Sequence, residues 1–135
     1  RWAAVEALAR AGIFTGILLM PMLPWITDAW ENIESIVARA ADAGARFVYP
    51  GFGVTLRMNQ KAYFYQEVDK RYPGMARRYA EVYGPESHCI CPDAESLWKR
   101  FEEACQTKGL LYRMEDIVAE SRQPYCQEQI RMDEW

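Results

Sequence analysis

The chain has 135 residues, about the size of one domain, and its 50% hydrophobic and 26% charged residues give the balance of an ordinary globular protein. Its formal net charge of −3 and pI of about 5.2 exclude the broadly basic surface of proteins that hold duplex DNA by electrostatics. The longest apolar run, residues 16–26, contains two prolines and is too short to span a bilayer, and no signal-peptide pattern is present. We therefore expect a cytoplasmic protein that does not enter a membrane.

The first predicted unit is a helix followed by a strand. The apolar residues Ala4, Val5 and Leu8 lie on one face at helical spacing, which predicts an amphipathic helix over residues 2–11. Gly12 stands where a C-cap glycine belongs. The nearly continuous apolar run at residues 13–20 then predicts a strand that is buried on both faces, as in parallel sheets.

The second unit repeats this order after a loop at residues 21–24. Asp28 and Glu31 have the spacing of a capping box, Gly44 ends the predicted helix, and residues 46–49 form the second predicted strand. Strands that alternate with helices at this spacing predict the α/β class, with a parallel sheet or barrel. Two strands are too few for a sheet or a barrel of this kind. The chain also starts inside a predicted helix and without methionine, so we expect a piece of a longer protein.

Beyond residue 57 the predicted elements are helices and loops. Helices are expected at residues 60–71, 75–83, 93–108 and 114–120, separated by breaks that contain proline or glycine. The sequence therefore predicts two parts, an α/β part at residues 1–57 and a helical extension at residues 58–135.

Candidate ligand-binding residues follow the second predicted strand, because parallel α/β folds bind ligands at the carboxyl ends of their strands. Gly51 and Gly53 would permit close backbone approach to a ligand or unusual φ values. Thr55 offers a hydroxyl, and Arg57 offers a planar fork that suits a carboxylate or phosphate. The alternative is that the glycines only make a turn and that Arg57 pairs with a helix carboxylate.

The loop after the first predicted strand contains Met20, Met22 and Pro24. These side chains would form an apolar wall for a flat aromatic group such as adenine. Packing in the core is the alternative, because methionine commonly fills gaps there.

The segment HCIC at residues 88–91 invites a metal-site interpretation, with Cys105 and Cys126 as further ligands. The spacing Cys-x-Cys is poor for one tetrahedral zinc, which usually takes two to four intervening residues. We therefore predict no metal site, and we expect the four cysteines to be reduced structural residues. His88 is the only histidine in the sequence, and no partner for acid–base catalysis is evident.

The chain resembles the C-terminal half of a radical S-adenosylmethionine (SAM) core over the run RWAAVEALARAGIFTGILLMPMLPWITDAWENIESIVARAADAGARFVYPGFGVTLR. Within that superfamily it resembles the spore-photoproduct-lyase-like proteins, also called DNA repair photolyase-like. The phrases AGIFTGILLMPMLPWITD and GARFVYPGFGVTLR resemble their last two barrel units. The segments RMNQKAYFYQEVDKRYPGMARRYAEVYG and LWKRFEEACQTKGLLYRMEDIV resemble the C-terminal extension of one branch, as does the terminal EQI.

This resemblance implies the last βα units of a partial TIM-like barrel, followed by a helical extension. Proteins of the superfamily carry a 4Fe-4S cluster on a Cys-x3-Cys-x2-Cys motif; the cluster reduces SAM, and the resulting radical abstracts a hydrogen atom. That motif is absent here. The chain alone should thus hold neither cluster nor SAM and should be inactive. The parent protein is expected to be a lyase-like enzyme, with the rest of the parent chain as partner and DNA as candidate substrate.

The resemblance also places two sets of residues. The set near SAM comprises Met20, Met22, Pro24, Gly51 and Gly53. The set that faces the substrate comprises Thr55 and Arg57. A radical-relay thiol at Cys89 or Cys91 is a further alternative.

An alternative function of a different class is that of a non-catalytic module that binds protein or nucleic acid. Basic residues interleaved with tyrosines would carry it, namely Lys61, Lys70, Arg71, Arg77 and Arg78. Affinity for single-stranded DNA that falls with salt would favour this module. A truncated barrel would also expose strand edges, so the isolated chain is expected to self-associate.

Overall fold

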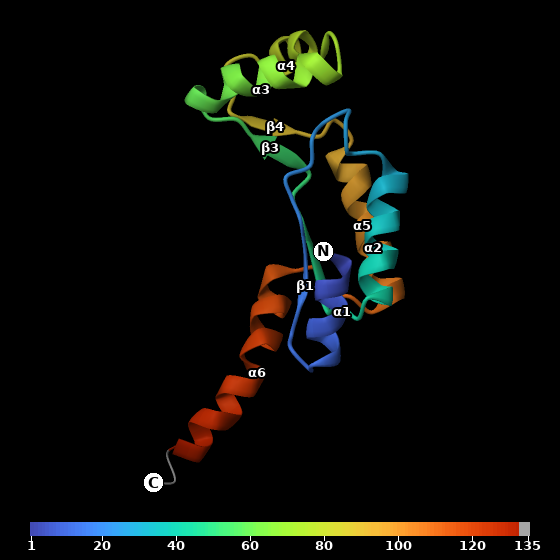
Figure 1. The fold of residues 1–135 in the computed structure, drawn as a ribbon, viewed down its shortest axis with the longest axis vertical. Coiled ribbons are helices and arrows are strands. Elements are labelled where there is room, and N and C mark those ends of the chain that lie inside the picture. Colours follow the sequence, from blue (N-terminus) through green and yellow to red (C-terminus); the bar gives the residue numbers. More distant parts are fainter. Residues whose placement is uncertain (133–135) are drawn as a thin grey trace.

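The computed structural model describes the backbone of residues 1–132 and the side chains of residues 1–123. This part of the chain contains the following elements: α1 (Trp2–Arg10), β1 (Gly16–Leu19), α2 (Trp30–Asp42), β2 (Phe47–Pro50), β3 (Gly53–Thr55), α3 (Met58–Arg71), α4 (Met75–Tyr83), β4 (His88–Ile90), α5 (Ala94–Lys108) and α6 (Met114–Met132). Figure 1 shows α1, α2 and α5 grouped on one side of β1, and α6 extending away on the other. The predicted α/β class is confirmed.

Three helices end in the same way and each leads into a parallel strand. Gly12, Gly44 and Gly109 follow α1, α2 and α5 with φ values of 75°, 81° and 69°, a conformation that glycine adopts without a Cβ penalty. In each case the amide after the glycine donates to the carbonyl five residues earlier, at 3.0, 2.9 and 2.9 Å: Ile13 to Leu8, Ala45 to Ala40, and Leu110 to Cys105. The predicted glycine caps are thus confirmed, and they turn each helix back toward the sheet.

The parallel pairing that the sequence predicted is present. Strand β1 pairs with β2 in parallel, with Ile17 opposite Val48. On its other edge β2 forms a parallel bridge between Phe47 and Leu111, and the Val48 amide donates to the Leu111 carbonyl at 2.9 Å. The described residues therefore form three successive helix–glycine–strand units, of which the third was not predicted. They do not close a barrel.

A larger hydrophobic core fills the space between these strands and their helices. Ile33 and Val37 of α2, Val48 of β2 and Phe101 of α5 have exposed fractions of 0%, 1%, 0% and 0%. Each such side chain stabilises the fold by roughly 1.5–3 kcal/mol through burial. The core combines residues from both sides of position 57, because α5 packs beside α2.

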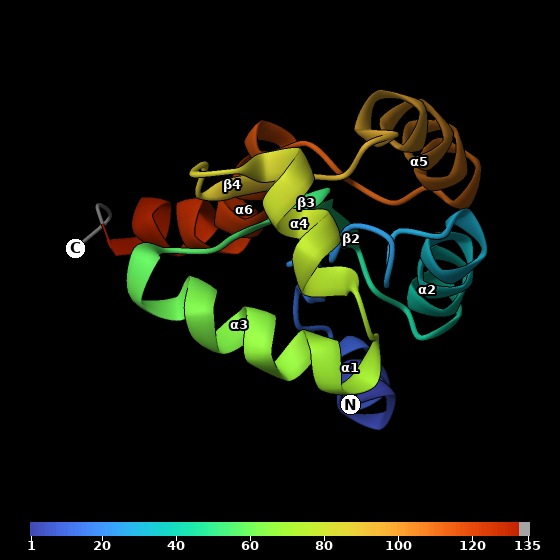
Figure 2. The same ribbon diagram turned by 90° about the horizontal axis from the view of Figure 1, so that it is seen from above.

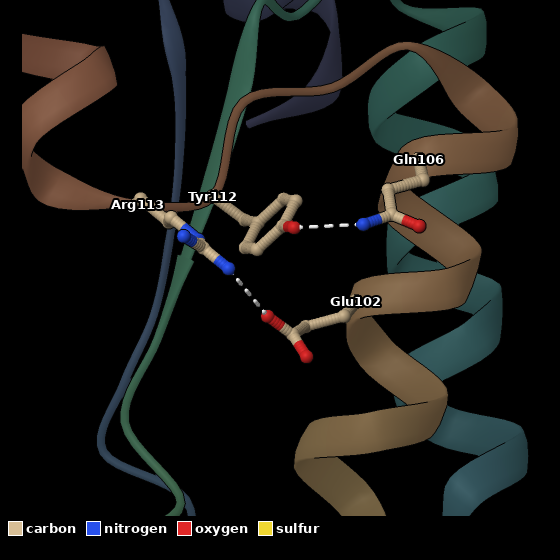
Figure 3. A network of polar contacts seen from close by, with 4 residues as sticks. All are labelled: Glu102, Gln106, Tyr112 and Arg113. Atoms are coloured by element: carbon tan, nitrogen blue, oxygen red, sulfur yellow. Dashed lines mark hydrogen bonds and ion pairs between the residues drawn. The ribbon is translucent and has the colours of Figure 1, made fainter.

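Polar contacts connect the segment after Leu111 to α5. Figure 3 shows the side chains of Tyr112 and Arg113 reaching back to that helix just after the Leu111 bridge. The Gln106 amide nitrogen donates to the Tyr112 hydroxyl at 3.0 Å, and Arg113 pairs with Glu102 at 3.4 Å. These two contacts connect α5 to the segment from which α6 begins.

Residues 51–91 form an insertion between the second and third units. Its strands β3 and β4 pair in antiparallel fashion, with Val54 opposite Cys89, and neither strand was predicted. Helices α3 and α4 cover one face of this pair, as Figures 1 and 2 show. A second, aromatic core lies between them: Leu56, Tyr79 and Cys89 are buried, and Trp25, Phe64 and Tyr83 pack around them.

Several predicted element ends differ from the structure. The capping box is wrong, because α2 has Ala29 at its N-cap and no side chain caps it. The Thr27 hydroxyl instead accepts the Leu23 amide at 2.8 Å and closes the preceding turn. The ladder of β1 covers a shorter stretch than the apolar run, and α6 continues well past residue 120. None of the helices in the described part is both long and apolar enough to cross a bilayer.

Replacement of Tyr79 by phenylalanine should destabilise the protein by about 1–3 kcal/mol. The Tyr79 side chain is fully buried and its hydroxyl donates to the Pro24 carbonyl at 3.0 Å, so the variant leaves a buried acceptor without its partner. Urea unfolding measures the change. Tyr63→Phe is the matched control, because Tyr63 is 68% exposed, and it should stay within about 0.5 kcal/mol of the original. Equal effects from both variants would contradict the assigned hydrogen bond.

Candidate functional site

The candidate site lies where two surfaces meet at the carboxyl ends of β1 and β2. Helices cover one face of these strands, and we call the other their second face. The β3–β4 pair, which we call the ribbon, overhangs this second face in both Figure 1 and Figure 2. Such strand ends are where parallel α/β folds bind their ligands.

The second face is apolar. Successive side chains of a strand point to opposite faces, and because Ile17, Leu19 and Val48 pack into the larger core, Leu18 and Tyr49 belong to the second face. Leu18 is 64% exposed and Met20, just beyond the strand, is 41% exposed. The site therefore has an accessible apolar floor at the carboxyl end of the sheet.

The ribbon presents its polar side to the same space. Val54 and Cys89 face the aromatic core under α3 and α4, so Thr55 and His88 lie on the opposite face, and both are exposed. The Thr55 hydroxyl lies 3.2 Å from the His88 Nδ1 atom. A pocket of about 240 Å³ borders this pair, and the exposed Ile90 and the backbone at Gly51 and Gly53 also line it.

The two glycines make close approaches within the protein. A Cβ on Gly53 would lie 2.7 Å from the Cys89 carbonyl oxygen, so the glycine is required for β3 to pair with β4. A Cβ on Gly51 would lie 3.0 Å from the Cβ of Met20. Neither glycine has a positive φ, so the expectation of unusual φ values is wrong. Both carbonyls accept the Met22 amide, at 3.2 Å from Gly51 and 3.1 Å from Gly53.

The three candidates of the first loop are in two different environments. Met22 is 2% exposed and Pro24 is also buried, so both side chains pack in the protein interior. Met20 is exposed and lies beside Gly51. The structure thus brings Met20, Gly51, Gly53 and Thr55 to one site and leaves the side chains of Met22 and Pro24 beneath it.

Arg57 ends the segment that leaves β3. It is exposed, and it makes no ion pair with any side chain that the structure describes. The alternative that Arg57 pairs with a helix carboxylate therefore finds no support. Leu56 is buried in the aromatic core, so alternation along the extended chain sends Arg57 toward the same side as Thr55.

The described cysteines do not form a metal site. Cys89, Cys91 and Cys105 are buried as free thiols, and within the described residues no group of three or more potential ligands could hold a metal ion. Burial raises the pKa of Cys105 to about 12, and burial with the nearby Asp28 raises that of Cys91 to about 12. These thiols are protonated at neutral pH. The side chain of Cys126 lies outside the described residues.

Several residues of the predicted basic cluster have interaction partners within the same chain. Lys70 pairs with Glu67 and Arg77 with Glu81, both at exposed positions. The Arg78 guanidinium lies over the Trp25 ring, 4.3 Å from its centre. These contacts are at exposed positions, and binding of nucleic acid by the cluster stays a prediction.

Sequence reasoning missed the ribbon and with it the pairing of Thr55 with His88. The two residues lie 33 positions apart and face one another only because β3 and β4 pair. The sequence HCI has no polar–apolar alternation that would signal a strand, because the exposed Ile90 is itself apolar. The cysteines drew attention to metal binding instead.

The chain is similar to uncharacterized proteins of mycobacteria. It is 31% identical over 83 residues to Rv2578c of Mycobacterium tuberculosis (strain H37Rv), and equally to Mb2609c of Mycobacterium bovis. The aligned part is 62% of this chain but 24% of each relative, so it spans about a quarter of the length of the curated relatives it matches. No protein-family model matches the chain, and no solved structure matches it.

Alkaline pH should destabilise the protein through its buried thiols. The folded-state pKa values of Cys91 and Cys105, about 12, lie above the ordinary value of 9.0. Their contribution to stability is therefore complete below pH 9 and is lost as the pH rises toward 12. Urea unfolding at a series of pH values measures this loss.

The variant Cys105→Ala tests whether this thiol contributes to the pH dependence. The free energy of unfolding of the variant should fall less steeply between pH 9 and 12 than that of the original protein, because one buried ionisable group is gone. Identical slopes would contradict the assignment.

Proposed function

We propose that the chain is the C-terminal part of the core of a radical SAM enzyme, of the spore-photoproduct-lyase-like type, together with its C-terminal extension. One observation carries the proposal: three successive helix–glycine–strand units place β1, β2 and Leu111 in parallel with their helices on one side. This is the arrangement of a segment of a barrel wall.

The accessible second face supports the same assignment. In a barrel this face would line the interior, and its carboxyl end would border the ligand. Met20 and Gly51 lie at that end, and we assign them to the SAM side of the site. Thr55 and Arg57, on the overhanging ribbon side, are assigned to the substrate, for which DNA remains the candidate. The buried side chains of Met22 and Pro24 would stabilise the loop that follows β1.

The iron–sulfur cluster does not fit the described residues. The three described cysteines are buried and separate, and the HCIC spacing does not match the cluster motif. We therefore assign the cluster to another part of the parent protein, where it would reduce SAM. The present chain would contribute walls of the site and would be inactive alone.

The rest of the parent chain would cover the free edge of β1. A groove of about 480 Å³ lies along this strand, and it is lined mainly by apolar side chains, among them Trp2, Val5, Ile17 and Leu18. In the described part β1 pairs with β2 alone, so the backbone groups on its other edge are available to a further strand.

The full-length parent protein, purified without oxygen, should contain about four irons per chain and should cleave SAM to 5′-deoxyadenosine when a reductant is added. Iron and sulfide analysis and chromatography of the nucleoside measure both. Protein with neither iron nor reductant-dependent cleavage would overturn the proposal.

Met20→Lys in that protein should slow SAM cleavage by at least about tenfold, because a cation would enter the apolar floor beside a cationic cofactor. Val82→Lys is the control, since Val82 is 57% exposed on α4, away from the site. Equal losses from the two variants would argue against the placement of Met20.

The 135-residue chain by itself should self-associate, because the β1 edge and its apolar groove would have no cover. Light scattering at micromolar concentrations measures its mass. Leu18→Lys places a charge on the 64% exposed position of that strand and should shift the chain toward the monomer. A monomeric original chain would contradict this expectation.

A further inference from the structure

The polar face of the ribbon carries the two residues assigned above to the substrate, Thr55 and Arg57, together with His88, to which the proposed function gives no role. Thr55 and His88 form an exposed pair on neighbouring strands, and Arg57 follows on the same side. We infer that this face, formed by Thr55, Arg57 and His88, is a binding site for a phosphate-type oxyanion. The inference depends on the described residues alone and not on the presence of a cluster or SAM.

The Thr55–His88 pair always leaves one hydrogen-bond donor for a ligand. If the Thr55 hydroxyl donates to Nδ1 of His88, the imidazole proton is on Nε2 and remains available. If Nδ1 carries the proton and donates to Thr55, the hydroxyl hydrogen is available instead. Both proton arrangements therefore suit a ligand whose atoms are acceptors, as phosphate oxygens are.

Arg57 supplies the charge. Its guanidinium is exposed and forms no ion pair among the described side chains, so binding an anion would break no existing pair. A guanidinium fork matches two oxygens of a phosphate, and such charged hydrogen bonds are roughly twice as strong as neutral ones. Lys61 lies instead on the side of α3, where its Nζ donates to the Glu86 carbonyl at 3.0 Å and lies 6.0 Å from the centre of the Tyr65 ring.

The ribbon holds these groups on a rigid support. Gly53 packs against the Cys89 carbonyl, the Leu56 amide donates to the Ser87 carbonyl at 2.7 Å, and the Tyr83 hydroxyl donates to the Ile90 carbonyl. The backbone that carries Thr55 and His88 is thus fixed before a ligand arrives, which lowers the entropic cost of binding. The adjoining pocket and the 60% exposed Ile90 leave room for the organic part of a phosphorylated molecule.

Glu86 is the acidic residue closest in sequence to this face, two positions before His88. Its carboxylate has no ion-pair partner among the described side chains and would oppose an anion. Glu86→Gln should therefore strengthen phosphate binding, whereas removal of a cation should weaken it.

The test is a titration of the full-length protein with inorganic phosphate at constant ionic strength, followed by NMR of the histidine side chains. The His88 signals are those lost in His88→Gln. They should shift saturably with phosphate, and the apparent affinity should fall about tenfold or more in Arg57→Gln. Absence of a saturable shift in the original protein would overturn the inference.

Two matched pairs of variants distinguish a specific phosphate site from non-specific electrostatic attraction of phosphate to the protein surface. Arg71→Gln removes the same charge from the exposed end of α3 and should leave the affinity unchanged. Thr55→Ser keeps the hydroxyl and should bind, whereas Thr55→Val keeps the shape and should bind more weakly. Equal losses from Arg57→Gln and Arg71→Gln would show non-specific attraction and overturn the site.

A second titration distinguishes the source of the phosphate group. Competition by a single-stranded oligodeoxynucleotide that depends on Arg57 would identify a nucleic-acid phosphodiester as the ligand group. Competition by a mononucleotide of equal or greater strength would identify a small phosphorylated molecule. Both outcomes support the anion site. Displacement of phosphate by neither, combined with no Arg57 dependence, would contradict it.

Discussion

The backbone amide of Met22 determines how the two halves of the site meet. It is shared between the carbonyls of Gly51 and Gly53, at 3.2 and 3.1 Å, and so ties the loop after β1 to the segment between β2 and β3. The Met22 side chain is 2% exposed, and loss of a buried backbone pairing is costly, so this junction has little freedom. The Gly51 amide strengthens it by donating to Leu19 at 3.0 Å. The ribbon consequently begins at a fixed position beside the second face.

The elements that could be predicted from the sequence are those specified by local chemistry. The amphipathic stripes of α1 and α2, their terminal glycines and the short apolar strand β2 each depend on neighbouring residues, and the structure contains all of them. The third unit was missed although Gly109 precedes two leucines in the same order. Its strand is a single bridge at Leu111, too short to produce a recognisable pattern.

The candidate site was only partly predictable because it depends on the pairing of β3 with β4, two strands that are far apart in the sequence. Met20, Gly51, Gly53, Thr55 and Arg57 could be found from their positions after predicted strands. Nothing in the neighbourhood of Thr55 indicates His88, since the antiparallel register of β3 and β4 is set by the aromatic core of α3 and α4. The same core explains the buried Cys89, which sequence spacing alone presents as a potential ligand.

The two hydrophobic cores position different parts of the site. The larger core fixes the strands and hence the apolar floor, whereas the aromatic core fixes the ribbon and hence its polar groups. One contact between them is made by the Tyr79 hydroxyl of the aromatic core, which donates to the carbonyl of Pro24 in the loop whose Met22 belongs to the larger core. Because Tyr79 contributes no atom to the ribbon's exposed face, its loss should act on stability. Changes at Thr55, Arg57 or His88 lie on the exposed side and should act on ligand binding with little effect on either core.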